Sequence, residues 1–124
     1  MVRRARLIYN PSSGREEMRR RLPDILDRLE RGGLETSCHE TKGTKDATWA
    51  AEEAIRRGFD VVIAAGGDGT IYEVVNGLAE RENRPKLGIL PVGTTNDFAR
   101  ALGIPRHWEQ AVDIILKQET MEID

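Results

Sequence analysis

The sequence has a single cysteine, Cys38, in 124 residues, so no disulfide can form within the chain. It has no apolar run near the roughly 20 residues that a membrane-spanning helix needs. It also has no repeat, charged tail or Ser/Gly/Pro linker that would divide it. The net charge is only −2 although 32% of the residues are charged, which gives no general reason to expect binding to nucleic acid. We therefore expect one domain in a reducing cytoplasm, with any anion site confined to a local cluster.

Short apolar runs alternate with amphipathic stretches, which is the pattern of βαβ units that feed a mostly parallel sheet in an α/β domain. The N-terminal arginines run straight into Leu7-Ile8-Tyr9, which is too short for a signal peptide and is interpreted as part of the first strand. The predicted strands are Ala5 to Asn10, Leu34 to Thr41, Val61 to Ala65 and Leu87 to Val92, and Met121 to Asp124 resembles the start of another.

Apolar residues at helical spacing predict helices over residues 18–29, 47–55, 71–78 and 108–116. Thr70 and Glu73 are spaced as a capping box for the third helix, because each can satisfy a main-chain N–H at the helix start. Pro23 falls inside the first helix and is expected to kink or restart it, since proline removes a donor and clashes with the preceding turn.

Three polar loops follow predicted strands and lead into helices: Asn10 to Arg15, Gly66 to Thr70 and Gly93 to Asp97. In open α/β sheets, ligands bind in the crevice at the carboxyl ends of the strands. The middle loop has three glycines in four positions, so few Cβ atoms would keep its backbone from a phosphate, and the following helix start favours an anion. A carboxylate beside phosphates is repulsive unless it meets a cation, a ribose or water-bridged Mg²⁺, so Asp68 indicates metal–nucleotide chemistry.

Each loop also has a purely structural interpretation. Glycine-rich turns let a helix pack closely on a strand, Thr95 or Asn96 can be an ordinary helix cap, and Asn10 to Gly14 can be a simple turn. The P-loop pattern is absent, and Tyr72 stands where a dinucleotide fingerprint starting at Gly67 has its third glycine. The coincidence of three donor-rich loops at one edge favours a ligand site of another kind.

The same residues carry a family resemblance. Gly66-Gly67-Asp68-Gly69-Thr70 is similar to the GGDGT signature of the diacylglycerol, sphingosine and NAD kinase superfamily. Three further motifs resemble the lipid-kinase branch, and most closely the soluble bacterial diacylglycerol kinases: Asn10-Pro11-x-Ser13-Gly14, Thr70-x-x-Glu73-Val74-Val75-Asn76-Gly77-Leu78 and Leu90-Pro91-Val92-Gly93-Thr94-Thr95-Asn96-Asp97-Phe98-Ala99-Arg100. The resemblance runs along the whole chain and implies a three-layer, Rossmann-like lobe with helices flanking a mostly parallel sheet.

The resemblance implies that ATP and Mg²⁺ bind at this edge of the sheet. The residues that it assigns to the nucleotide are Asn10, Pro11, Ser12, Ser13, Gly14, Thr41, Gly66, Gly67, Asp68, Gly69, Thr70, Gly93, Thr94 and Thr95. Arg15 follows the first loop where relatives commonly have Lys or Arg, so we expect it to contact phosphate. Asp68 is expected in a water-bridged magnesium network, and Asn96, Asp97 and Asp124 in a polar network that leads to it.

The resemblance also implies a second, mostly β lobe that this sequence does not contain. In this family that lobe carries the base for the lipid hydroxyl and further magnesium ligands. Because phosphoryl transfer needs nucleophile, metal and γ-phosphate together, we expect no catalytic base in residues 1–124 and no turnover by this fragment alone. The full protein is expected to convert diacylglycerol to phosphatidic acid as a cytoplasmic enzyme that meets the membrane through the missing lobe.

Two alternatives to a diacylglycerol kinase stay open. One is another lipid or NAD kinase of the superfamily, although the Thr94 to Asp97 loop counts against the NAD branch. The other is a non-catalytic nucleotide-binding module. An apolar face uncovered by a missing lobe can also pair two copies of the chain, so a homodimer is a further expected partner.

The histidines, the cysteine and the tryptophans receive structural interpretations. His39 and His107 lack partners at metal-ligand spacing, so we interpret them as surface or strand-edge residues. Cys38 is interpreted as a small hydrophobe rather than a reactive thiol. Trp49 and Trp108 fall at apolar helix positions, which favours core or inter-lobe packing over stacking on adenine.

Overall fold

A computed structural model describes residues 3–11, 15–79, 82, 84–91, 101, 103–104 and 107–118. Among them are the strands β1 (Arg3–Tyr9), β2 (Leu34–Glu40), β3 (Val61–Gly66) and β4 (Lys86–Pro91) and the helices α1 (Arg15–Arg31), α2 (Asp46–Arg56), α3 (Asp68–Leu78) and α5 (Trp108–Gln118). The predicted strands and helices are confirmed, with strand ends that differ by no more than two residues. The strand predicted at Met121 to Asp124 lies outside the described residues.

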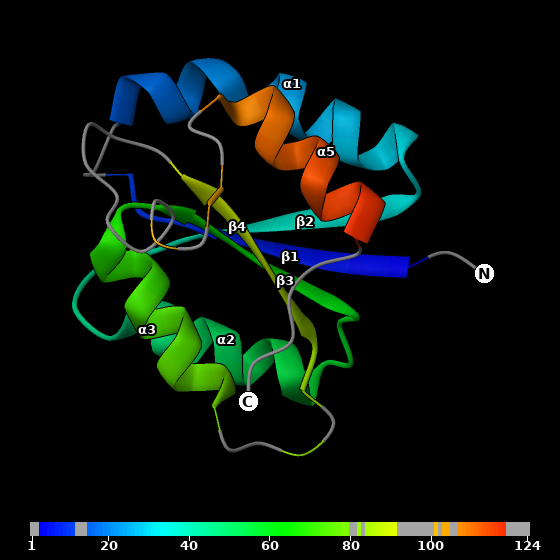
Figure 1. Cartoon of the computed structure of the whole chain (residues 1–124). Helices are drawn as coiled ribbons and strands as arrows, with labels where there is room; N and C mark the ends of the chain where they lie inside the picture. The colour runs from blue at the N-terminus through cyan, green and yellow to red at the C-terminus, as the bar shows by residue number, and fades with distance from the viewer. Residues whose placement is uncertain are drawn as a thin grey trace.

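The described strands form one parallel sheet in the order β2-β1-β3-β4. From β1 the chain crosses to β2 on one side, whereas from β3 it crosses to β4 on the other, so the winding direction changes between β1 and β3 (Figure 1). The carboxyl ends are in line, because Tyr9 is paired with both Glu40 and Ala65 and Gly66 with Pro91. Loops that follow the strands therefore meet at one edge.

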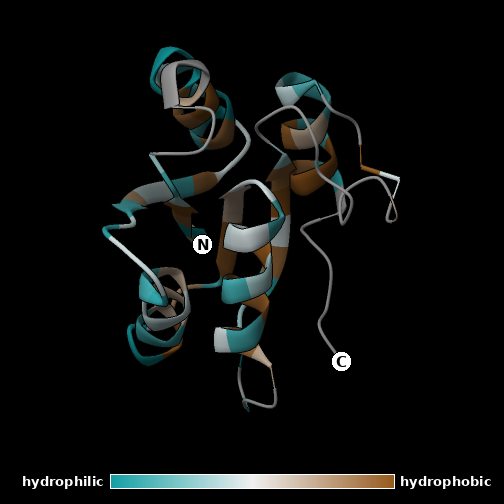
Figure 2. Ribbon diagram, turned by 90° about the vertical axis from the view of Figure 1, so that its left-hand side faces the viewer, coloured by the Kyte–Doolittle hydropathy of each residue, from teal (hydrophilic) through white to brown (hydrophobic). Residues whose placement is uncertain are grey.

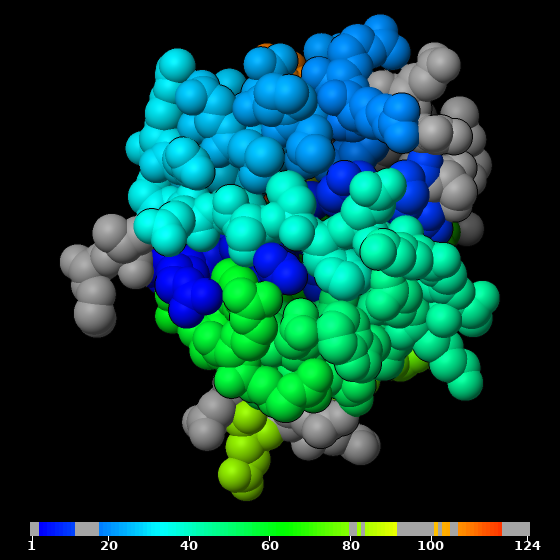
Figure 3. All heavy atoms as spheres, turned by 180° about the vertical axis from the view of Figure 1, so that it is seen from behind, coloured from blue at the N-terminus to red at the C-terminus, as the bar shows by residue number. Residues whose placement is uncertain are grey.

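Helices cover both faces of the sheet, as predicted for a three-layer α/β domain. α1 and α5 lie on one face and α2 and α3 on the other (Figure 1), with a separate apolar core under each pair. Every residue of β3 is buried, as expected of a strand covered on both faces. Figure 2 shows the apolar residues gathered on the sheet and on the helix turns that face it. Seen from behind, the edge strand β2 (cyan) lies at the surface between the α1 and α2 layers, and β1 (dark blue) is visible beside it in patches (Figure 3).

The start of α3 differs from the prediction. The helix begins at Asp68 with Gly67 as its cap, and no side chain caps it, so the Thr70–Glu73 capping box is wrong. The reason is that Thr70 already lies in the first turn of the helix and is buried there, whereas Gly67 has the extended backbone of a cap residue. Starting three residues earlier than predicted places more of the glycine loop within the helix N-terminus.

Two other predictions each left two outcomes open, and one outcome of each is wrong: the restart of α1 at Pro23 and the core position of Trp49. The kink at Pro23 and the inter-lobe packing of Trp49 stay predictions. α1 runs through Pro23 as one helix and does not restart there, because Pro23 is exposed and water can solvate the carbonyl group that lacks its donor. Trp49 is not a core residue: 46% of its surface is exposed, because α2 turns Ala47, Ala50 and neighbouring alanines toward the sheet instead. Trp108 does pack against the core between α1, α5 and the sheet.

Candidate functional site

The change in winding direction between β1 and β3 defines the candidate site. Ligands of open α/β sheets bind at such a switch point, beyond the carboxyl ends of the two strands. Here β1 leads into Asn10 and Pro11, and β3 leads through Gly66 into Gly67 and α3. Two of the three loops selected from the sequence therefore flank the switch point.

Thr41 joins this edge from the neighbouring strand β2. Its N–H donates to the carbonyl oxygen of Tyr9 at 2.9 Å, which extends the β1–β2 pairing by one residue and sets Thr41 beside the start of the first loop. Thr41 is one of two buried polar residues in the described part of the chain, the other being Thr70. A buried hydroxyl group at the end of a strand is suited to bind a polar ligand.

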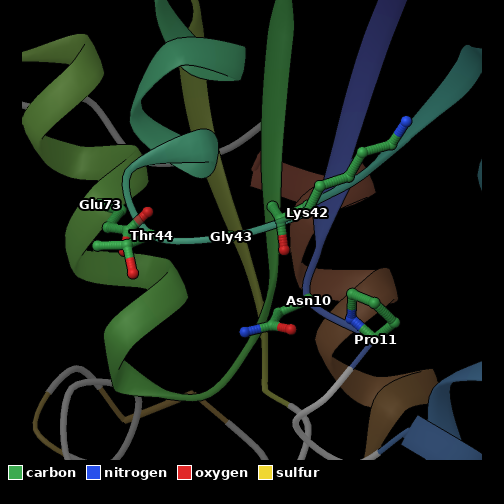
Figure 4. A pocket seen from close by; sticks show the side chains of 7 residues that line it. Asn10, Pro11, Lys42, Gly43, Thr44 and Glu73 are labelled. Atoms are coloured by element: carbon green, nitrogen blue, oxygen red, sulfur yellow. The ribbon is translucent and has the colours of Figure 1, made fainter.

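A cavity of about 420 Å³ lies between these segments. Its lining residues come from the ends of β1 and β2, from the loop after β2 and from α3: Asn10, Pro11, Thr41, Lys42, Gly43, Thr44 and Glu73. In Figure 4, Asn10 and Pro11 lie on one side of the cavity, and the Lys42 side chain extends away from Asn10. The structure thus brings Asn10, Pro11 and Thr41 together, as predicted, in a space of the size that small-molecule sites have.

A side chain would have different effects at two glycines of the middle loop, Gly66 and Gly69. Gly66 has φ +151°, and a Cβ there would lie 3.2 Å from Thr70 Cβ, so backbone and packing both require glycine. Gly69 is exposed in the first turn of α3, and a Cβ there would meet no described atom within 4 Å. Packing therefore accounts for Gly66, as the structural interpretation holds, but does not account for Gly69, which has open space around it in the first turn of α3. A group that needs close approach to the amides at the start of α3, such as a phosphate, fits this space.

The packing of α3 on α2 places Glu73 at the cavity. Thr48 Oγ1 donates to the carbonyl oxygen of Glu73 at 2.8 Å, and Gly77 one turn later lies against the Thr48 backbone. Glu73 was predicted to cap α3, but it lies in the second turn and lines the cavity instead.

The segment between β2 and α2 is held by side chains. Asp46 Oδ2 accepts from the Lys42 N–H at 2.9 Å and lies 3.1 Å from His39 Nε2. Burial raises the pKa of the Asp46 carboxyl, but the hydrogen bonds from His39 and Lys42 outweigh it, so the pKa lies below its usual range. His39 is confirmed as a residue of an edge strand, while its contact with Asp46 was not foreseen.

Several predicted site residues fall outside the described part of the chain: Ser12, Ser13, Gly14, Gly93, Thr94, Thr95, Asn96, Asp97 and Asp124. Arg15 begins α1, but its side chain is not described, so its phosphate contact stays a prediction. Asp68 begins α3 at the candidate site, and within the described residues no group of three His, Cys, Asp or Glu side chains could hold a metal ion. The described residues do not by themselves make a metal centre.

Four cavity residues, Lys42, Gly43, Thr44 and Glu73, were missed as site residues in the sequence. Three of them belong to the loop after β2, which ends at the same edge as the loops that were selected. The strand-end rule applied equally to this loop, and its glycine and threonines were the available signal. Glu73 could not be found locally, because the packing of α3 on α2 brings it to the cavity.

Comparisons with known proteins agree with this geometry. The family model for the diacylglycerol kinase catalytic domain matches residues 4–124. Among curated proteins, a diacylglycerol kinase of Staphylococcus haemolyticus (strain JCSC1435) is 57% identical over 120 residues, which cover 97% of this chain and 36% of that protein. A diacylglycerol kinase of Staphylococcus aureus (strain bovine RF122 / ET3-1) is 54% identical over 124 residues, covering 100% and 39%.

A solved structure of a diacylglycerol kinase from Bacillus anthracis str. Sterne superposes with a TM-score of 0.82 at 38% identity, over 93% of this chain and 40% of that one. The chain thus spans about two fifths of the length of the proteins that it matches.

Proposed function

Since the chain belongs to the diacylglycerol kinase catalytic domain family, we propose that it is the nucleotide-binding lobe of a lipid kinase. The full protein transfers the γ-phosphate of ATP to the hydroxyl group of diacylglycerol and releases phosphatidic acid and ADP. This lobe binds and orients the nucleotide. A second, mostly β lobe supplies the base and the lipid pocket.

The observation that carries the proposal is the open space over Gly69 at the start of α3. The glycine loop brings main-chain N–H groups and the positive end of the helix dipole to the switch point, where they bind phosphate oxygens. The cavity between Asn10, Thr41 and Glu73 offers amide, hydroxyl and carboxylate groups to the remainder of the nucleotide. In this mechanism the lobe contributes position and electrostatic stabilisation rather than a reacting group.

Mg²⁺ neutralises phosphate charge in such reactions when it is bound. Asp68 begins α3 at the candidate site and would help to hold Mg²⁺ there through water, as the family motifs imply. In the proposal, Asn96, Asp97 and Asp124 support Asp68, and Arg15, the serines of the first loop and Thr94 and Thr95 complete the nucleotide site. The assignment of these residues rests on the family motifs.

The lipid acceptor requires contact with a membrane surface. The helices in the described part of the chain include none with the length and apolarity to cross a bilayer. We therefore propose a cytoplasmic protein that associates peripherally with the membrane through its second lobe. We also propose that two copies of this lobe, when it is produced alone, form a homodimer. They would contact each other through the face that the second lobe covers in the full protein.

The test is a kinase assay of the full-length protein with γ-labelled ATP, Mg²⁺ and mixed micelles. Labelled phosphatidic acid from diacylglycerol is the expected product. Preferential labelling of another lipid would assign a different lipid kinase, and labelling of NAD would place the protein in the NAD branch. Binding of ATP without transfer to any acceptor would show a nucleotide-binding module and refute the kinase proposal.

A further inference from the structure

Asp46 forms a clamp at the cavity wall, which we define by the two hydrogen bonds that its carboxylate accepts. One comes from the main-chain N–H of Lys42 at 2.9 Å, the other from His39 Nε2 at 3.1 Å. Because an ionised carboxylate can only accept, Nε2 carries the hydrogen in this contact. Both side chains are largely buried, Asp46 being 24% and His39 17% exposed. A hydrogen bond to a charged and partly buried acceptor is stronger than one at an open surface.

The clamp closes the loop formed by residues 41–45. The Asp46 N–H donates back to the carbonyl oxygen of Gly43 at 3.2 Å, so Asp46 contacts the loop through both its side chain and its main chain. Within the same loop Lys45 has φ +69°, a left-handed conformation that is unfavourable for a residue with a Cβ. No side chain caps the start of α2 at Lys45. The loop therefore keeps an unfavourable backbone at a place where the Asp46 clamp opposes its relaxation.

The clamped loop forms a wall of the cavity. Thr41, Lys42, Gly43 and Thr44 all line it. Figure 4 shows the loop running from Lys42 through Gly43 to Thr44, away from Asn10 and toward Glu73. The β1–β2 pairing already fixes Thr41 through its bond to Tyr9, whereas the clamp acts on Lys42 and the residues after it. Release of the clamp would leave one end of the wall in place and free the other.

Trp49 contacts the clamp at His39. Its ring centroid lies 6.0 Å from that of His39 at an interplanar angle of 48°. The Trp49 ring, on a half-exposed side chain of α2, therefore packs against the ring that donates to Asp46. The clamp is thus a supported arrangement drawn from β2, the loop and α2.

We propose that Asp46 is a positioning residue for the nucleotide, which acts by holding the loop 41–45 as a preformed wall of the site. His39 and Trp49 support it. The proposal rests on the nucleotide site proposed above. Its physical basis is preorganisation: a wall that is already ordered loses less conformational freedom when the ligand binds.

The experiment compares Asp46→Ala with Glu53→Ala in the full-length protein. Glu53 is a matched control because it lies on the same helix, is also an ion-paired carboxylate and is 25% exposed, but its partners Arg6 and Arg57 do not line the cavity. We expect Asp46→Ala to raise KM for ATP, and Kd for a non-hydrolysable ATP analogue, about tenfold with little change in kcat. Glu53→Ala should leave both constants near those of the wild type.

Two further readouts separate positioning from general destabilisation. Asp46→Asn retains an oxygen that accepts from the Lys42 N–H, so its KM should lie between those of the wild type and Asp46→Ala. Hydrogen exchange of the Lys42 amide should speed up in Asp46→Ala, while the amides of β3 stay protected as in the wild type.

The outcomes distinguish this proposal from the proposed function. Unchanged ATP affinity in Asp46→Ala, with wild-type binding intact, would overturn the positioning role alone. Failure of the wild type to bind ATP or its analogue would overturn the nucleotide site and this inference with it. An equal loss of affinity in Glu53→Ala and Asp46→Ala would also overturn the positioning role, since it would assign the loss to α2 stability.

Discussion

Gly77 on α3 lies directly against Thr48 on α2. A Cβ at residue 77 would stand 2.5 Å from the carbonyl oxygen of Thr48 and 2.7 Å from the Cβ of Ala51. One turn earlier, Thr48 Oγ1 donates to the carbonyl oxygen of Glu73. These contacts set the separation of the two helices, and with it the position of the α3 wall of the cavity.

We predict that Gly77→Ala destabilises the protein. Neither atom in the way is the flexible end of a side chain, so the helices must move apart, at a cost of about 1–3 kcal/mol from overpacking. The gain in helix propensity offsets about 1 kcal/mol of this. Urea denaturation should show a net loss of up to about 2 kcal/mol in the free energy of unfolding. A variant as stable as the wild type would show that the α2–α3 interface yields easily.

Gly69→Ala is the same substitution on the same helix as Gly77→Ala, but we expect no loss of stability from it. No described atom opposes a Cβ there, so the free energy of unfolding should stay unchanged or rise by up to about 1 kcal/mol. If phosphate approaches the amides at the start of α3, the added methyl group blocks it, and affinity for ATP should fall about tenfold or more. Calorimetric titration of the full-length variant measures this. Wild-type affinity would argue against the assignment of this space to phosphate.

Asp68→Ala tests the magnesium role. We expect turnover by the full-length enzyme to fall about a hundredfold or more, since a group that helps to hold the metal acts on the charge of the transition state. Loss of an acidic residue from the first helical turn should lower stability by only about 0.3–1 kcal/mol. The assay is repeated across Mg²⁺ concentrations, with Asp68→Asn as the comparison variant. Unchanged turnover and unchanged Mg²⁺ dependence in both variants would refute the role.

The sequence predicted the sheet most directly at β3, because a strand that is covered on both faces is a short, continuous apolar run. Val61 to Ala65 is such a run, and β3 is buried throughout. The first residue of α3 was harder to predict from the sequence. Thr70 with Glu73 and Gly67 alone are both acceptable helix caps when only the local sequence is considered. Burial of Thr70 in the folded protein decides between them.

The site shows the same division between local and long-range information. Asn10, Thr41 and the glycine loop follow strands, so the order of elements places them at one edge. The Asp46 clamp depends on a side chain of β2 that meets the first turn of α2, and Glu73 reaches the cavity through the contact of α3 with Thr48. Such contacts between elements have no signature in the pattern of apolar and polar residues. The contact of Trp49 with His39 was not foreseen for this reason, because His39 lies on a strand.

Lys45→Gly should stabilise the protein. The left-handed conformation costs a residue with a Cβ roughly 1–2 kcal/mol, and the greater freedom of glycine in the unfolded chain takes back about 0.5–1 kcal/mol. A net gain of up to about 1.5 kcal/mol in the free energy of unfolding is expected. Lys42→Gly is the control, since Lys42 has no positive φ, and it should lose about 0.5–1 kcal/mol. Equal losses in both variants would show that the conformation of Lys45 is not strained.

The stability contributed by Asp46 should depend on pH with a definite sign. Its pKa is lower in the folded protein than the value of about 3.9 expected for the unfolded chain. The contribution is therefore present above about pH 4 and is lost as the pH falls through the folded pKa. The difference in free energy of unfolding between the wild type and Asp46→Asn should be full at pH 6 and shrink toward pH 3. Parallel pH curves would contradict the clamp.

Asp113→Asn provides the comparison for this measurement. The hydrogen bonds from Arg28, at 3.0 Å each, also lower the pKa of the Asp113 carboxyl, so its pH dependence has the same sign. Asp113 is 56% exposed, whereas Asp46 is 24% exposed. Salt screens exposed pairs more strongly than partly buried ones. Added salt should therefore reduce the pH dependence of the difference in free energy of unfolding between wild type and variant, and it should do so more for Asp113→Asn than for Asp46→Asn. A larger effect of salt on Asp46→Asn than on Asp113→Asn would mean that solvent reaches the Asp46 clamp freely. Hydrogen bonds that solvent reaches freely could not hold the loop 41–45 as a preformed wall of the cavity.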